Sequence, residues 1–165
     1  MTESSYRNKI YEHYATNFQN RSVEFPYEES IRWRKSYKWW FRDWLPLDKN
    51  SKILDVACGT GYLLHYLKDI GYKNTYGVDI SPEQIEIAQQ ISGQCEIGNC
   101  LDYLDEHLGE FDLIIGLDIV EHLHKDQVLE FLGKCYNALS KNGRMILQTP
   151  NGESPWGTVY RYGDL

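Results

Sequence analysis

The chain has 165 residues, a net charge of −7 and 42% hydrophobic residues, which fits one globular domain. The acidic balance disfavours nucleic acid as a partner, because phosphates attract basic proteins. No apolar run approaches the roughly 20 residues of a membrane span, and the N-terminus has no apolar signal core. We therefore expect a cytoplasmic protein with no membrane partner. The cysteine and histidine spacings match no strong metal motif, so we also expect no metal site.

Residues 1–48 are rich in aromatic side chains and are predicted to form a helical cap or extension. A first helix is predicted over residues 6–18. A second is predicted over residues 28–44, where aromatic residues recur at three- and four-residue steps and so share a face. This stripe consists of Trp33, Tyr37, Trp40, Phe41 and Trp44. It predicts packing onto the main domain, or a lid that brings Tyr11 or Tyr14 over the active site, and the two readings are compatible.

Residues 49–165 alternate short apolar runs with amphipathic segments, which is typical of strand–helix units. Strands are predicted over residues 53–57, 75–79, 95–98, 111–117 and 144–149, and helices over residues 62–70, 82–91 and 125–139, the last ending near Asn142-Gly143. Residues 101–108 are predicted to form a short helix or a loop. The alternation predicts an α/β fold of the Rossmann-like, doubly wound type. Its mainly parallel sheet should have about five strands in the order 3-2-1-4-5, with helices on both faces. Ligands of such sheets bind where the carboxyl ends of the strands meet.

The first predicted strand ends in an acid and runs into the glycine-containing turn Asp55-Val56-Ala57-Cys58-Gly59-Thr60-Gly61. Gly59 and Gly61 allow the backbone to turn tightly and a ligand to approach closely. A dinucleotide fingerprint would have a third glycine where Leu64 stands. Asp55 would repel a pyrophosphate but attract a ligand with ammonium and sulfonium charges. The charges therefore favour S-adenosylmethionine, which carries both and has no phosphate.

The second predicted strand ends at Asp79, 18 residues after Gly61, about where such folds place the acid that binds ribose hydroxyls. The pattern Asp55-x-x-x-Gly59-x-Gly61 followed by Gly77-Val78-Asp79 resembles the class I S-adenosylmethionine-dependent methyltransferases. The resemblance covers residues 52–150 and is strongest to the small-molecule branch that includes ubiquinone-biosynthesis enzymes. It implies that the turn after the first strand holds the methionine end of the cofactor and that Asp79 holds the ribose.

The same resemblance assigns two later segments. Asn99 stands where the family often has an acid that accepts a hydrogen bond from adenine, and Cys100 stands where the next backbone N–H meets the ring, although Asn99 could equally be a turn residue. Asp118 would lie at the mouth of the fourth strand, facing the methionine end and the substrate. His122 is placed to remove a proton as a catalytic base, the alternative being that Glu121 and His122 cap and pack the loop. The expected cofactor-binding residues are Tyr14, Asp55, Ala57, Cys58, Gly59, Gly61, Asp79, Ile80, Asn99, Cys100, Leu117 and Asp118.

The resemblance implies methyl transfer from S-adenosylmethionine to an oxygen or nitrogen of a small molecule, with S-adenosylhomocysteine as product. Three alternatives stay open at this point: an NAD-dependent oxidoreductase, a non-catalytic cofactor-binding domain, and an RNA or protein methyltransferase. The family's sheet normally continues with a helix and a terminal strand hairpin, for which no residues remain after the fifth strand. We therefore expect an N-terminal fragment that binds cofactor but turns over poorly. Its fifth strand would be an exposed edge, so we expect either a homodimer formed through this strand or a cover provided by the residues that follow it.

Overall fold

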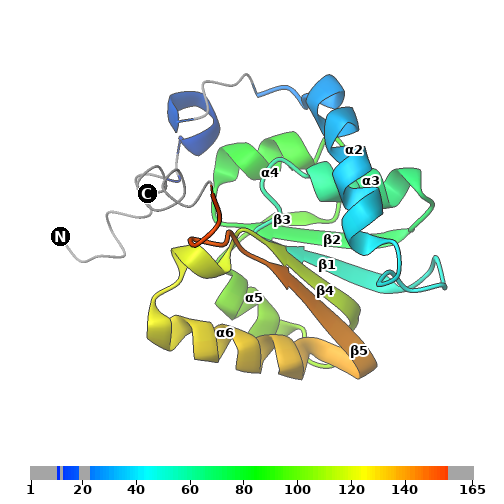
Figure 1. Cartoon of the computed structure of the whole chain (residues 1–165), viewed down its shortest axis with the longest axis vertical. Helices are drawn as coiled ribbons and strands as arrows, with labels where there is room; N and C mark the ends of the chain where they lie inside the picture. Colours follow the sequence, from blue (N-terminus) through cyan, green and yellow to red (C-terminus); the bar gives the residue numbers. More distant parts are fainter. Residues whose placement is uncertain (1–10, 12, 19–22, 156–165) are drawn as a thin grey trace.

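The computed structural model describes residues 11, 13–18 and 23–155. Five strands form one parallel sheet in the order β3-β2-β1-β4-β5 (Figure 1). The strands are β1 (Lys52–Val56), β2 (Asn74–Asp79), β3 (Cys95–Ile97), β4 (Phe111–Leu117) and β5 (Leu139–Gln148). The predicted Rossmann-like fold and its strand order are confirmed.

Helices cover both faces of the sheet (Figure 1). One face carries α2 (Tyr27–Phe41), α3 (Tyr62–Asp69) and α4 (Pro82–Ala88), and the other carries α5 (Cys100–Glu106) and α6 (Lys125–Ala138). A π-helical turn, η1 (Tyr14–Phe18), lies beside α4, and a 3-10 turn, η2 (Val120–His122), follows β4. Of the helix predicted over residues 6–18, residues 6–10 and 12 lie outside the described residues, and the described part contains the π-helical turn η1. Within the described part of the chain, none of the helices combines the length and apolarity needed to cross a membrane.

The strands contribute side chains to two separate hydrophobic cores, because successive side chains of a strand point to opposite faces of a sheet. On the α2–α3 face, Ile53 and Leu113 are fully buried and pack with Leu67. On the α5–α6 face, Leu54 and Ile114 are fully buried in the other cluster. A sheet that is buried on both sides is a rigid support for whatever its carboxyl edge carries.

The aromatic stripe of α2 divides into two groups. Tyr37 and Phe41 are buried in the core on that face, which confirms the predicted packing for these two rings. Trp33, Trp40 and Trp44 remain 41%, 39% and 56% exposed. The helix ends at Phe41, three residues earlier than predicted, and Trp44 follows it in a turn.

The beginning of β5 differs most from the prediction. The strand begins at Leu139, not at residue 144, because Leu139 already pairs with Phe111 of β4. The Asn142-Gly143 pair, predicted to end the preceding helix, lies inside β5 at an irregularity of the strand pairing. Asn142 has a φ of 70°, and a Cβ on Gly143 would lie 2.8 Å from the Phe111 carbonyl oxygen. The pair therefore forms a bulge within the strand, where glycine is needed for close approach.

Within the described residues, β5 pairs only with β4 and is one of the two edges of the sheet, as predicted. An edge strand leaves backbone groups that another chain can pair with. Homodimerisation through β5 remains a prediction. The tail that was expected to cover this edge lies largely outside the described residues.

Gly77 of β2 fills a space with no room for a side chain. An added Cβ would lie 2.8 Å from both Cys58 Sγ and Leu64 Cδ1. Gly77→Ala should therefore lower the free energy of unfolding by about 1–3 kcal/mol, as overpacking does. Urea unfolding followed by tryptophan fluorescence measures this change.

Gly133 of α6 is the matched control, because a Cβ there would meet nothing within 4 Å. Gly133→Ala should raise the free energy of unfolding by up to about 1 kcal/mol, since alanine is the better helix former. Equal stability of wild type and Gly77→Ala would show that the β2 packing is looser than described.

Candidate active site

A cavity of about 540 Å³ opens at the carboxyl edge of the sheet, within the range of about 300–1,000 Å³ that is usual for ligand pockets. Every strand contributes to it, either through its last residues or through the loop that follows. Strand-end and loop residues in its wall include Asp55, Asp79, Asn99, Asp118 and Gln148. This is the predicted position for a ligand of such a sheet.

The turn after β1 has an unusual backbone. Ala57, Gly59 and Gly61 have φ values of 58°, 53° and 84°, which lie in the left-handed region. A non-glycine residue there, such as Ala57, is strained, and such strain gathers at functional sites. The surrounding hydrogen bonds hold it, because Cys58 N–H donates to the Val78 carbonyl of β2 at 3.1 Å.

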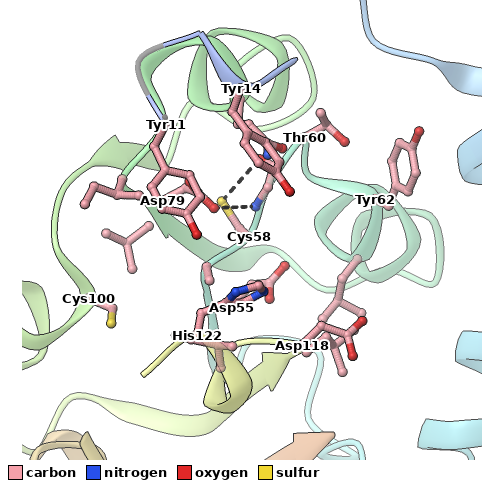
Figure 2. A pocket seen from close by; sticks show the side chains of 18 of the residues that line it. Tyr11, Tyr14, Asp55, Cys58, Thr60, Tyr62, Asp79, Cys100, Asp118 and His122 are labelled. Atoms are coloured by element: carbon pink, nitrogen blue, oxygen red, sulfur yellow. Dashed lines mark hydrogen bonds between the residues drawn. The ribbon is translucent and has the colours of Figure 1, made fainter. Parts of the chain in front are cut away.

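Asp79, the last residue of β2, holds this turn in place (Figure 2). Its two carboxylate oxygens accept from the N–H groups of Gly59 and Ser81, each at 2.9 Å. Burial raises the pKa of Asp79, and these two hydrogen bonds counteract the shift. Carboxylate oxygens have further lone pairs, so Asp79 can hold the turn and also accept from ribose hydroxyls. The geometry fits the predicted role.

Asp55 lies in the wall of the same pocket and is 3% exposed. Burial raises the pKa of this carboxyl well above its usual value, and the nearby Cys95 and Asp79 raise it further. No side-chain hydrogen bond joins it to another described residue. A buried carboxylate without a donor is stabilised by a cation, so the site suits a ligand that brings positive charge.

Asn99 begins α5 as its N-cap, and its Oδ1 accepts from the N–H of Leu101 at 2.8 Å. This matches the alternative reading of Asn99 as a turn residue, and contact with adenine remains a prediction. Both Asn99 and Cys100 line the pocket. Burial raises the pKa of the Cys100 thiol to about 11, so it contributes a neutral wall.

The segment after β4 brings Asp118 and His122 to the pocket. Asp118 has a φ of 53°, and its N–H donates to the Gln148 carbonyl at 2.9 Å. Glu121 instead accepts from the Thr149 hydroxyl at 2.9 Å, so it fastens η2 to the chain after β5. Among the described residues, no three histidine, cysteine, aspartate or glutamate side chains gather as a metal site.

Tyr11 and Tyr14 reach the pocket because η1 is tied to α4. Glu83 of α4 accepts from the N–H and hydroxyl of Thr16 at 2.9 and 2.8 Å. The two tyrosine rings have centroids 5.3 Å apart. In Figure 2 they lie on the opposite side of the β1 turn from His122 and Asp118.

All but one of the predicted cofactor-binding residues line the pocket, and so does His122. The exception is Gly61, which begins α3 and packs against α4. An added Cβ there would lie 3.1 Å from the Ala88 Cβ. Gly61 therefore allows two helices to approach closely, while Gly59 borders the pocket itself.

Sequence reasoning missed part of the pocket wall. Glu29, Trp33, Tyr37 and Trp40 of α2 line it, although the sequence had suggested only a general lid. Their spacing of four, four and three residues places them on one helix face, and this signal was available. Gln148 was also missed; as the last residue of β5 it lies at the same sheet edge as Asp79.

Known proteins resemble this chain in sequence and structure. A family model for a methyltransferase domain matches residues 27–163. The ubiquinone biosynthesis O-methyltransferase of Azorhizobium caulinodans is 36% identical over 110 residues, covering 62% of this chain and 42% of that protein. The tRNA U34 carboxymethyltransferase of Cellvibrio japonicus is 28% identical over 148 residues, covering 74% of this chain and 45% of that protein.

A crystal structure of an S-adenosylmethionine-dependent methyltransferase from Archaeoglobus fulgidus superimposes with a TM-score of 0.69 at 26% identity. The match covers 84% of this chain and 63% of that one. The chain spans less than half the length of the two curated relatives above. Three observations point to the same family: the match of the family model over residues 27–163, the strand order, and the turn held by Asp79. The chain belongs to the class I S-adenosylmethionine-dependent methyltransferases.

Proposed function

We propose that the protein transfers a methyl group from S-adenosylmethionine to an oxygen or nitrogen of a small molecule. The observation that carries this proposal is the position of two buried carboxylates, Asp55 and Asp79, beside the turn after β1, whose backbone is left-handed at several residues. A small acceptor is supported by the pocket wall, which has no lysine or arginine among its described residues. An RNA acceptor would need such cations for its phosphates. The ubiquinone enzyme among the relatives also supports a small acceptor, whereas the tRNA enzyme supports the competing alternative, an RNA acceptor.

Each part of the pocket has a proposed role toward the cofactor, which supplies an electrophilic methyl group on a sulfonium when bound. Asp79, with Ile80 beside it, binds the ribose. Asp55 and the turn from Ala57 to Gly59 face the positively charged methionine end. Asn99 and Cys100 border the adenine, and Tyr14 covers the cofactor.

The remaining proposed roles concern the acceptor. Asp118 and Leu117 orient the acceptor at the mouth of β4, close to the methionine end. His122 accepts the proton of an acceptor hydroxyl as a general base, a role that histidine fills more often than any other side chain.

Replacing Asp79 should weaken cofactor binding. Asp79→Asn removes the charge from an acceptor of two backbone hydrogen bonds. Hydrogen bonds to charged groups contribute about 1.5–3 kcal/mol, so the Kd for S-adenosylhomocysteine should rise roughly 10- to 100-fold. Isothermal titration calorimetry measures this Kd. Asp43→Asn, which alters an exposed ion pair with Arg42, is the control and should bind like wild type. An unchanged Kd in Asp79→Asn would remove the proposed ribose role.

Asp55 should make the ligand-free protein less stable as the pH rises. Its raised pKa means that the folded chain holds this proton more tightly than the unfolded chain. Its contribution to stability is therefore complete below the unfolded pKa of about 4 and declines as the pH rises above it. Urea unfolding between pH 4 and pH 8 should show wild type losing stability relative to Asp55→Asn. The same variant should bind S-adenosylmethionine more weakly at neutral pH. Parallel pH profiles would contradict the raised pKa of this buried carboxyl.

The acceptor class is tested by turnover. The full chain is incubated with S-adenosylmethionine and either the small-molecule filtrate of a cell extract or purified total RNA, and S-adenosylhomocysteine is measured. We expect product with the filtrate and none with RNA. His122→Asn should lower that rate about 100-fold or more, as loss of a general base does, without changing the Kd for S-adenosylhomocysteine. Transfer to RNA alone would overturn the small-molecule proposal, and cofactor binding without any transfer would indicate a non-catalytic domain.

A further inference from the structure

We propose that the pocket wall formed by α2 is the acceptor subsite and that it binds an organic cation, an amine or ammonium compound without a phosphate. This inference rests on the proposed methyl transfer, because it assigns an acceptor to the same pocket. It is carried by the ring cluster on α2, by the charges around the pocket, and by the way α2 is fastened to the domain.

Three aromatic rings of α2 form a cluster in the pocket wall. The centroids of Trp33, Tyr37 and Trp40 are 5.9 to 6.0 Å apart in each pair. Their planes are inclined to one another by 24° to 67°, so the rings form an uneven wall. Trp33 and Trp40 remain 41% and 39% exposed in the described structure. Aromatic faces attract ammonium groups, tryptophan most strongly.

The charges around the pocket point to the same class of ligand. Glu29, Asp55, Asp79 and Asp118 contribute four carboxylates to the wall, and its described residues include no lysine or arginine. Among the described residues the acids of the wall outnumber the bases, and an acidic cleft favours cationic ligands over anionic ones. It also repels phosphate and carboxylate groups, so an anionic acceptor would bind poorly.

Tyr37 links the α2 wall to the place of methyl transfer. It is 6% exposed, and burial together with the charges of Asp55 and Asp118 raises its pKa. Tyr37 lines the same pocket as Asp55 and Asp118. Because Asp55 faces the proposed methionine end, an acceptor held against Trp33 and Trp40 would lie beside the reacting methyl group. A protonated or quaternary nitrogen has no lone pair, so the atom that accepts the methyl group is a hydroxyl oxygen of the same compound, or an amine nitrogen that has lost its proton, and His122 takes that proton.

The α2 wall is fastened to α3, the helix that begins at the cofactor turn. Ser30 Oγ is 2.8 Å from His65 Nδ1, and Arg34 forms an ion pair with Asp69. The rings of Tyr37 and Tyr66 pack with centroids 5.6 Å apart. A wall held in this way binds a ligand without having to order itself first.

The binding test uses three probes that share a shape but differ in charge. These are choline, its neutral isostere 3,3-dimethylbutan-1-ol, and phosphocholine. Each is titrated into the full chain with and without saturating S-adenosylhomocysteine, by calorimetry and tryptophan fluorescence. From the strength of cation–π contacts, choline should bind about 5- to 30-fold more tightly than the neutral alcohol. Phosphocholine should bind more weakly than choline.

Variants within one helix show whether the rings are responsible. Trp40→Ala should weaken choline binding about 5-fold or more. Trp39→Ala is the matched control. Trp39 is 67% exposed, carries Arg42 3.9 Å from its ring centroid, and does not line the pocket. It should leave choline binding unchanged, and both variants should bind S-adenosylhomocysteine like wild type.

Several outcomes would overturn the inference. Equal binding of choline and the alcohol would indicate an apolar subsite, and tightest binding of phosphocholine would indicate an anionic one. Failure of all three probes while S-adenosylhomocysteine binds would remove the α2 subsite and leave the proposed function intact. If S-adenosylhomocysteine itself does not bind, the proposed function fails, and the choline titration of the cofactor-free chain still decides the cation subsite.

Discussion

The shape of the site depends on one buried carboxylate, that of Asp79. Asp79 accepts one N–H from the turn after β1 and another from the start of the loop after β2. Parallel pairing of Val56 with Val78 brings Asp79 level with that turn. Without Asp79, the amides of Gly59 and Ser81 would lose these partners, and the strained φ of Ala57 would lose support. The turn after β1 therefore takes its shape when the chain folds, and a ligand binds to a surface that is already ordered.

Local signals in the sequence predicted this part of the molecule well. The apolar run of β4 has the predicted bounds, Phe111–Leu117, because a strand buried on both faces must be apolar throughout. The helix predicted from residue 82 does begin there as α4, because Ser81 caps it and Pro82 suits its first position, and both residues act within one turn. The strand order was expected as a property of the Rossmann-like, doubly wound fold type, which does not depend on particular residues.

The errors arose where one segment depends on a distant one. Asn142-Gly143 looks like a helix stop, and only the pairing of Leu139 with Phe111 makes it a bulge in β5. The stripe on α2 cannot reveal that Phe41 is buried while Trp33 borders a cavity, because this depends on where α3 lies. Asn99 offers the same amide oxygen for a helix cap or for a ligand, and its sequence position suits both.

The attachment of α2 also bears on how such a protein can diverge. The helix supplies no strand and takes no part in the pairing of the sheet, yet it provides Glu29, Trp33 and Trp40 to the pocket. Its anchors, Ser30 and Phe41, are buried and distinct from those three residues. Under the proposed methyl transfer, acceptor preference can therefore change through substitutions on one helix that leave the turn held by Asp79 untouched. For protein engineering, these three positions are a natural first library for altering the proposed acceptor subsite.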